Sequence, residues 1–292
     1  MGDWCLRVGS MVGVVSALAC SAEVDDYGSD AAVGSTHALI TVERSTTVDP
    51  QGGSSAEALA GFVRVPAEVD AKLAMQLLGL EFDLPPADTC RTLQTNDPSV
   101  PLAGMGRIEF LEAGKVVLQA GEAATDLAPR AFPTVTDLIS GVMYTTRGRT
   151  AEPLPAGASY TLRTTGGVEV PPVAAAAEAP DTLSGVTLQG IPLGDVSSVA
   201  TDIPQDLTWN VGRPGDTVWV QLSTPGKSDT VCVFRDDAGV GTIPAKAFSG
   251  QGTGRFAMHR QRTVAFTAAG LNRGVVRFDF QVSTAVDYAA RP

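Results

Sequence analysis

The second half of the chain shows a repeated alternation of apolar and polar residues. Apolar side chains take every second position over 207–211, 218–222 and 278–282, and turn sequences such as Pro214-Gly215 separate the runs. A period of two is typical of β-strands that bury one face. Runs that recur roughly every 8 to 12 residues are typical of β-sandwiches. We therefore expect this half to be all-β, with Trp209 on the buried side.

The first half predicts further strands and one short helix. Residues 107–112 and 115–119 alternate in the same way on either side of Ala113-Gly114, which predicts a hairpin with an apolar inner face. Near 67–79, helix-forming residues carry apolar side chains three or four positions apart. We expect a β-sandwich with one short helix in this part of the chain.

A stretch without alternation separates the two halves. Residues 171–181 contain two adjacent prolines followed by a run of alanines, and proline cannot donate a hydrogen bond to a sheet. This predicts a Pro/Ala linker between two tandem immunoglobulin-like β-sandwich domains, 36–170 and 182–292. Trp209 resembles the buried tryptophan on the third strand of immunoglobulin domains, but the cysteine pair of that family is missing, so the resemblance extends to architecture alone.

The first nineteen residues are expected to be a signal peptide. After Arg7 an apolar run reaches Ala19, and it is too short to cross a bilayer as a helix. The small residues before Cys20 resemble the lipobox of bacterial lipoproteins, which implies a lipid on Cys20. Residues 20–35 are acidic and lack periodicity, as expected of a flexible tether. The alternatives are a plain secretory peptide cleaved near Ala19 or Ala22, and an uncleaved buried helix.

Removal of the signal peptide and acylation of Cys20 would leave two cysteines, Cys90 and Cys232. In an oxidising compartment they can form one disulfide, which would join the two predicted domains across a loop of roughly 140 residues. The alternative is two buried thiols, which the apolar neighbours of Cys232 favour. The sequence has no CxxC motif and no Cys/His cluster, which argues against zinc and thiol–disulfide chemistry.

Composition and charge limit the partners. Mean hydropathy is +0.11, enough apolar content for buried cores. The formal net charge is −11, whereas nucleic-acid binding depends on clustered Lys and Arg. We expect no nucleic-acid partner.

The search for chemistry finds few candidates. The two histidines, His37 and His259, have no potential catalytic partners near them in the sequence, and we expect both on strand surfaces. The sequence contains no GxSxG, P-loop or dinucleotide-binding motif. We therefore expect no catalytic residues and no cofactor. Asp236 and Asp237 are candidate Ca²⁺ ligands in a turn, with a solvated turn as the alternative. Trp219 shares a face with polar residues, so we expect it to be exposed and able to contact a ligand.

Three segments resemble a group of uncharacterised lipoproteins of high-GC Gram-negative bacteria. They are Cys20 with its acidic spacer, the segment 154–160, and the strand 229–234 with its continuation to 241–244. The resemblance implies immunoglobulin-like sandwiches that follow a lipid anchor in the chain. It implies no activity.

These features predict an exported, non-catalytic envelope lipoprotein that serves as a binding, adhesion or scaffold module. Its expected partners are the membrane, through the lipid, and an envelope protein or extracellular glycan. We expect the outer membrane or cell surface rather than the inner membrane. One alternative is a carbohydrate-binding module that uses Trp219. Another is a hydrolase whose site combines the Arg260/Arg262 region with acids in loops.

Overall fold

A computed structural model describes residues 34–48, 52–77, 83–93, 107–135, 139–146 and 154–291. The predicted signal peptide, Cys20 and most of the predicted tether lie outside these ranges. Within them, no helix is both long and apolar enough to cross a membrane.

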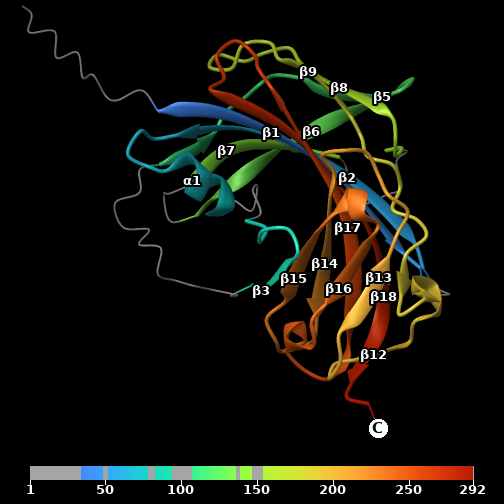
Figure 1. The fold of residues 1–292 in the computed structure, drawn as a ribbon. Coiled ribbons are helices and arrows are strands. Elements are labelled where there is room, and N and C mark those ends of the chain that lie inside the picture. The colour runs from blue at the N-terminus through green and yellow to red at the C-terminus, as the bar shows by residue number, and fades with distance from the viewer. Residues whose placement is uncertain are drawn as a thin grey trace, which may run out of the picture. The chain divides into compact units, whose positions relative to one another are not determined.

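Fourteen of the described strands are joined in one sheet (Figure 1). The order across the sheet is β3-β15-β14-β17-β18-β1-β2-β4-β7-β6-β5-β8-β9, and β12 also pairs with β18. Its strands are β1 (Ser35–Thr47), β2 (Ser54–Val65), β3 (Thr89–Thr92), β4 (Ile108–Phe110), β5 (Val116–Ala120), β6 (Ala123–Val135), β7 (Ile139–Thr145), β8 (Ser159–Thr164), β9 (Ala174–Glu178), β12 (Ser198–Ala200), β14 (Thr217–Ser223), β15 (Thr230–Arg235), β17 (Gly252–Phe266) and β18 (Arg273–Ala289).

A second, smaller sheet has the order β11-β10-β13-β16. Its strands are β10 (Thr187–Leu188), β11 (Ile191–Pro192), β13 (Gln205–Thr208) and β16 (Val240–Ile243). Three short 3₁₀ turns complete this part of the fold, η1 (Leu193–Asp195), η2 (Asp236–Ala238) and η3 (Ala245–Ala247).

The large sheet joins strands from both ends of the chain. β1 runs parallel to β18, from His37 beside Arg273 to Thr47 beside Ser283. β3 pairs antiparallel with β15, which is also far along the chain. The all-β prediction is confirmed, but two tandem immunoglobulin-like domains are not, because residues 32–292 form one compact unit in which the expected domains share a sheet.

The interval 171–181, expected to be a linker, contains strand β9. β9 pairs antiparallel with β8, and its five residues alternate between exposed and buried. Because four of the five are alanines, the alternation leaves no contrast of apolar and polar types in the sequence. The alanine run therefore shows no alternation from which the strand could be predicted.

Strand parity divides the large sheet into two faces. Even-numbered side chains of β1, β14, β15, β17 and β18 enter two separate apolar cores, one around Phe278 and Tyr160 and one around Phe256 and Trp209. Odd-numbered side chains of the same strands point to the opposite side, because successive residues of a strand alternate. We call this opposite side the polar face.

The predicted helix is present as α1 (Ala71–Leu77). Asp70 caps it, since its Oδ1 accepts a hydrogen bond from the Leu73 N–H at 2.8 Å. Ala74 and Met75 pack with Leu39 and Phe110 in a third apolar cluster. Leu39 is an odd-numbered residue of β1, so α1 covers one end of the polar face.

Candidate functional site

Four strands that are distant in sequence build one row of polar side chains on the polar face. Register places Ser45 beside Gln281, Gln281 beside His259, and His259 beside Trp219. Residues in register on neighbouring strands share a face and lie about 5 Å apart. The row therefore crosses β1, β18, β17 and β14 without interruption.

A second row lies two residues further along the strands. Glu57 of β2 is in register with Glu43 of β1, and Glu43 with Asp279 of β18. Like charges placed directly opposite each other destabilise a sheet. Thr145 Oγ1 donates to Glu57 at 3.1 Å and His259 Nδ1 lies 2.9 Å from Asp279, so these contacts offset part of the repulsion.

The two rows line a cavity of about 720 Å³. Its walls come from β1, β2, β14, β15, β17 and β18, with Gln76 of α1 and the segment 83–93 that contains β3. Binding cavities for small molecules typically have volumes of about 300 to 1,000 Å³. This cavity is the candidate functional site.

Trp219 lines the cavity but is not exposed. Its predicted face is correct, since it lies with Gln221 on the polar face, but the predicted exposure is wrong because the residue is only 5% exposed. Its ring stacks on His259 with centroids 3.5 Å apart and planes inclined by 13°. Leu84 and Leu93 pack against the same cluster. The segment that carries these leucines covers the indole, which strand parity could not reveal.

His259 is a buried residue rather than the expected surface residue. It is 5% exposed, and its Nδ1 lies 2.9 Å from Asp279 Oδ1. An ionised carboxylate can only accept, so Nδ1 carries the proton and donates it. The other ring nitrogen, Nε2, is then an acceptor in the neutral ring. His37, the second histidine, is half-buried in β1 with Nε2 2.7 Å from Ser35 Oγ.

Two buried nitrogens at this site lack partners. Trp219 Nε1 and His259 Nε2 have no hydrogen-bond partner within the described ranges, and both residues line the cavity. A buried polar group left without a hydrogen bond costs about 1 to 3 kcal/mol. A bound molecule that supplied one acceptor and one donor would remove both penalties.

The carboxylate of Glu43 is perturbed by its surroundings. Burial raises the pKa of Glu43 above its ordinary value, and the nearby charge of Asp279 raises this pKa further. The side chain is nevertheless 54% exposed, because it faces the cavity. Arg277 Nη2 lies 3.9 Å from Glu43 Oε1, at the limit of an ion pair. The carboxylate is thus accessible, crowded by negative charge and only partly compensated.

A guanidinium lies further along the same face. Arg255 Nη2 donates to Gln281 Oε1 at 3.1 Å and to Ser283 Oγ at 3.2 Å. Arg91 also lines the cavity, but Asp83 accepts from it at 3.0 Å and neutralises it. Sequence patterns did not identify Glu43, Asp279 or Arg255 as site residues. Polar residues alternate with apolar ones along a strand in the same way whether the polar side faces solvent or a cavity.

The other candidate site residues form buried ion pairs away from this cavity. Asp236 is 0% exposed and its Oδ2 lies 2.8 Å from Arg260 Nε, while Trp209 Nε1 donates to Asp236 Oδ1 at 2.9 Å. Arg262 binds the Asp216 carboxylate through two nitrogens at 2.6 and 2.7 Å. The expected solvated turn at Asp236 is corrected to a buried anion, which Arg260 and Trp209 already hold.

No His, Cys, Asp or Glu group of three or more is arranged to hold a metal ion in the part of the chain that the structure describes. The neighbouring Asp237 is exposed. The Asp236 carboxylate is already paired with Arg260, while Asp237 is on the surface, so the two side chains have different surroundings.

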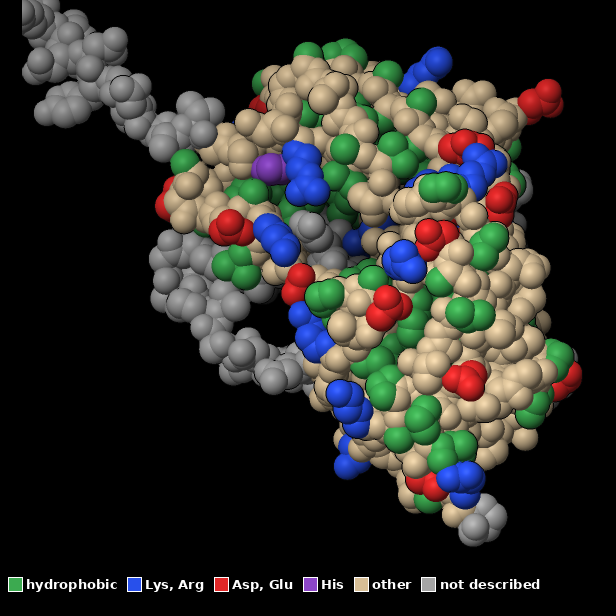
Figure 2. All heavy atoms as spheres, in the orientation of Figure 1, with side chains coloured by type: hydrophobic (Ala, Val, Ile, Leu, Met, Phe, Trp, Pro, Cys, Tyr) green, Lys and Arg blue, Asp and Glu red, His purple; other side chains and the backbone are tan. Residues whose placement is uncertain are grey.

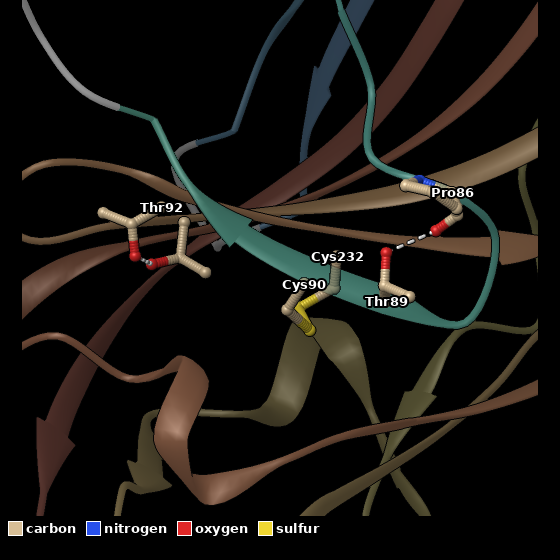
Figure 3. The surroundings of a disulfide bond; sticks show 6 residues. Pro86, Thr89, Cys90, Thr92 and Cys232 are labelled. Atoms are coloured by element: carbon tan, nitrogen blue, oxygen red, sulfur yellow. Dashed lines mark hydrogen bonds between the residues drawn. A yellow bond between two sulfur atoms is a disulfide. The ribbon is translucent and has the colours of Figure 1, made fainter.

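Cys90 and Cys232 form a disulfide (Figure 3). The sulfur atoms are 2.08 Å apart, and the two residues are directly in register on β3 and β15. Two residues along the same pair of strands, the hydroxyls of Thr92 and Thr230 lie 3.3 Å apart. The bond therefore ties β3 to the edge of the sheet beside the cavity, instead of joining two separate domains.

Comparison with known proteins shows little similarity. No family model and no curated protein matches the chain. Among solved structures, the chain is similar to the Fcho1 Mu homology domain of Danio rerio with bound Eps15 peptide, at 8% identity and a TM-score of 0.24. The similarity covers 87% of this chain and 97% of that one. A score this low carries no argument about fold or function.

Proposed function

We propose that this chain is an exported, non-catalytic binding protein whose ligand occupies the cavity on the polar face. The observation that carries the proposal is the pair of buried, unpartnered nitrogens, Trp219 Nε1 and His259 Nε2, in the wall of a 720 Å³ cavity. Most buried polar groups in folded proteins are hydrogen-bonded, so two without partners in one cavity need an explanation. A ligand that offers one acceptor and one donor here gains hydrogen bonds from Trp219 and His259.

Binding fits the arrangement better than catalysis does. His259 and Asp279 form the orienting half of a nucleophilic triad, but no hydroxyl or thiol within the described ranges is hydrogen-bonded to His259 Nε2. The alternative hydrolase region is occupied by the buried pairs of Arg260 and Arg262. The pair at His259 therefore fixes the ring and its acceptor nitrogen.

A sugar-stacking role for Trp219 is less favoured by the same geometry. Sugar recognition by tryptophan needs an accessible ring face. In this protein one face of the ring is covered by His259, and the residue is 5% exposed. A glycan therefore would have to contact the polar groups of the cavity instead of the indole face.

The proposed setting is the bacterial envelope, with the chain tethered through a lipid on Cys20 and residues 20–35. The net charge of −11 supports a partner other than nucleic acid. Acidic and basic side chains are interspersed on the face drawn in Figure 2, which therefore has no extended basic patch. Cys20→Ala should shift the protein from the membrane fraction to the soluble fraction and remove an acyl mass from the chain.

The description as two tandem immunoglobulin-like units also remains a proposal. Two separate apolar cores support it, and each unit would be built around one of them. The units would share β17 and β18, which contribute to both cores.

The test of the binding proposal is a thermal-shift screen of the purified mature chain. The panel contains amino acids, short peptides, polyamines, sugars and nucleotides. Ser55 lines the cavity, so Ser55→Trp should obstruct it and reduce the stabilisation by a bound compound. Ser197 is exposed and is not part of the cavity lining, so Ser197→Trp is the matched control. A compound that stabilises Ser55→Trp as much as the parent chain would refute the assignment of the cavity, as would a panel without any binder.

A further inference from the structure

The cavity separates negative from positive charge. Glu57, Glu43 and Asp279 form its acidic row on β2, β1 and β18. Arg255 points its guanidinium at Gln281 and Ser283 of β18, and no carboxylate lies within ion-pair distance of it in the described part of the chain. One end of the cavity therefore favours a cation and the other an anion.

The separation of the two ends follows from the strand that carries both. Asp279 precedes Gln281 by two residues and Ser283 by four on β18. At about 3.3 Å per residue, Asp279 and the Arg255 guanidinium are roughly 7 to 13 Å apart along β18. A free α-amino acid is too short to bridge this distance, because its ammonium and carboxylate are attached to one carbon. Two or three extended residues span about 7 to 11 Å.

The unpartnered nitrogens lie between these ends. Trp219 Nε1–H can only donate, and His259 Nε2 is an acceptor in the neutral tautomer whose Nδ1–H donates to Asp279. A peptide group offers one acceptor, its carbonyl, and one donor, its amide N–H. It therefore complements both nitrogens with a single chemical unit.

We infer that the ligand of this cavity is a short zwitterionic peptide of two or three residues. Its ammonium group lies at Glu43 and Asp279, its carboxylate at Arg255, and a backbone amide against Trp219 and His259. The inference rests on the proposed binding function and names the ligand class. Glu43 and Arg255 determine specificity in this arrangement, because each recognises a charged end that every free peptide has and a blocked peptide lacks.

The experiment is isothermal titration calorimetry of the mature chain with trialanine, triserine and trileucine. Each peptide is tested free, N-acetylated and C-amidated. At least one free peptide should bind, and either blocking group should weaken its binding about tenfold or more, as expected for the loss of a charged hydrogen bond. Equal affinity for free and blocked peptides, or no binding by any of the three, would overturn the inference.

Two substitutions assign each charged end to its residue. In Arg255→Gln, the free and C-amidated peptides should bind equally, while N-acetylation should still weaken binding. In Glu43→Gln the pattern should reverse. These preferences compare two ligands on one variant, so a general loss of folding does not imitate them. Glu122→Gln and Arg163→Gln, which remove exposed charges outside the cavity lining, are the matched controls and should keep both preferences.

The peptide titration and the thermal-shift screen can fail independently of each other. If no peptide binds but another compound stabilises the parent chain more than Ser55→Trp, the peptide inference fails and the binding function stands. If no compound of any class binds, both fail.

Discussion

Removal of the disulfide between Cys90 and Cys232 should strongly destabilise the fold. The bond closes a loop of 142 residues. The chain-entropy relation assigns about 5 kcal/mol to a loop of this length, and measured effects of native disulfides are about 2 to 5 kcal/mol. β3 has few other attachments, because it is four residues long and pairs only with β15 in the described structure. We therefore expect Cys90→Ala/Cys232→Ala to lower the free energy of unfolding by about 2 to 5 kcal/mol.

The assay is urea unfolding of the mature chain under non-reducing conditions, followed by far-UV circular dichroism. Cys90→Ala alone should cost about as much as the double variant, because either substitution removes the same bond. Thr92→Val serves as a control that removes only the hydroxyl contact with Thr230. A loss below about 1 kcal/mol in the double variant would refute the reasoning, since it would mean that the cross-link does not restrict the unfolded chain.

The same substitution should also affect the cavity. Arg91 of β3 and the neighbouring Leu93 line it, and Leu93 packs against the Trp219 cluster. Faster hydrogen exchange at residues 89–92 in the double variant would show that β3 has loosened. Unchanged exchange there would mean that the backbone hydrogen bonds to β15 are sufficient to hold the strand.

Three further outcomes are expected. Arg260→Met should lower the free energy of unfolding by about 3 to 5 kcal/mol in urea denaturation, because it leaves the buried Asp236 carboxylate without its counter-charge; adding Asp236→Leu should restore part of the loss. Glu43→Gln should raise the melting temperature near pH 7 but not near pH 3. The fold raises the pKa of Glu43 above its ordinary value of about 4.5, so its ionised form opposes folding only above that value. Equal effects at both pH values would contradict this. A fragment of residues 182–292 should not give a dispersed amide NMR spectrum, because its β18 lacks the parallel partner β1.

Strand positions and their buried sides were largely predictable from the sequence. The even-numbered apolar residues of β14 and β18 face the cores as their alternation predicts, and α1 lies inside the predicted interval. Alternation succeeds here because a strand with one buried face must place apolar side chains at every second position. It failed at β9, where alanines occupy both sides.

The partners of each strand were not predictable in this way. Parallel pairing of β1 with β18 joins the two ends of the chain, and nothing in either segment's pattern specifies the other. The same holds for the disulfide: the sequence left open whether Cys90 and Cys232 were bonded, and their pairing depends on β3 lying in register with β15.

The sequence alone determined that the chain forms strands with one apolar side, one short helix and few candidate catalytic groups. Tertiary structure decided that the opposite side forms the wall of an open cavity. Polar residues at alternate positions suit either a cavity wall or bulk water, since both supply hydrogen bonds. Leu84 and Leu93 of the disulfide-tied segment pack against the Trp219 cluster, and Trp219 stacks on His259, so both side chains are buried beside this cavity. One nitrogen of each has no hydrogen-bond partner within the described ranges.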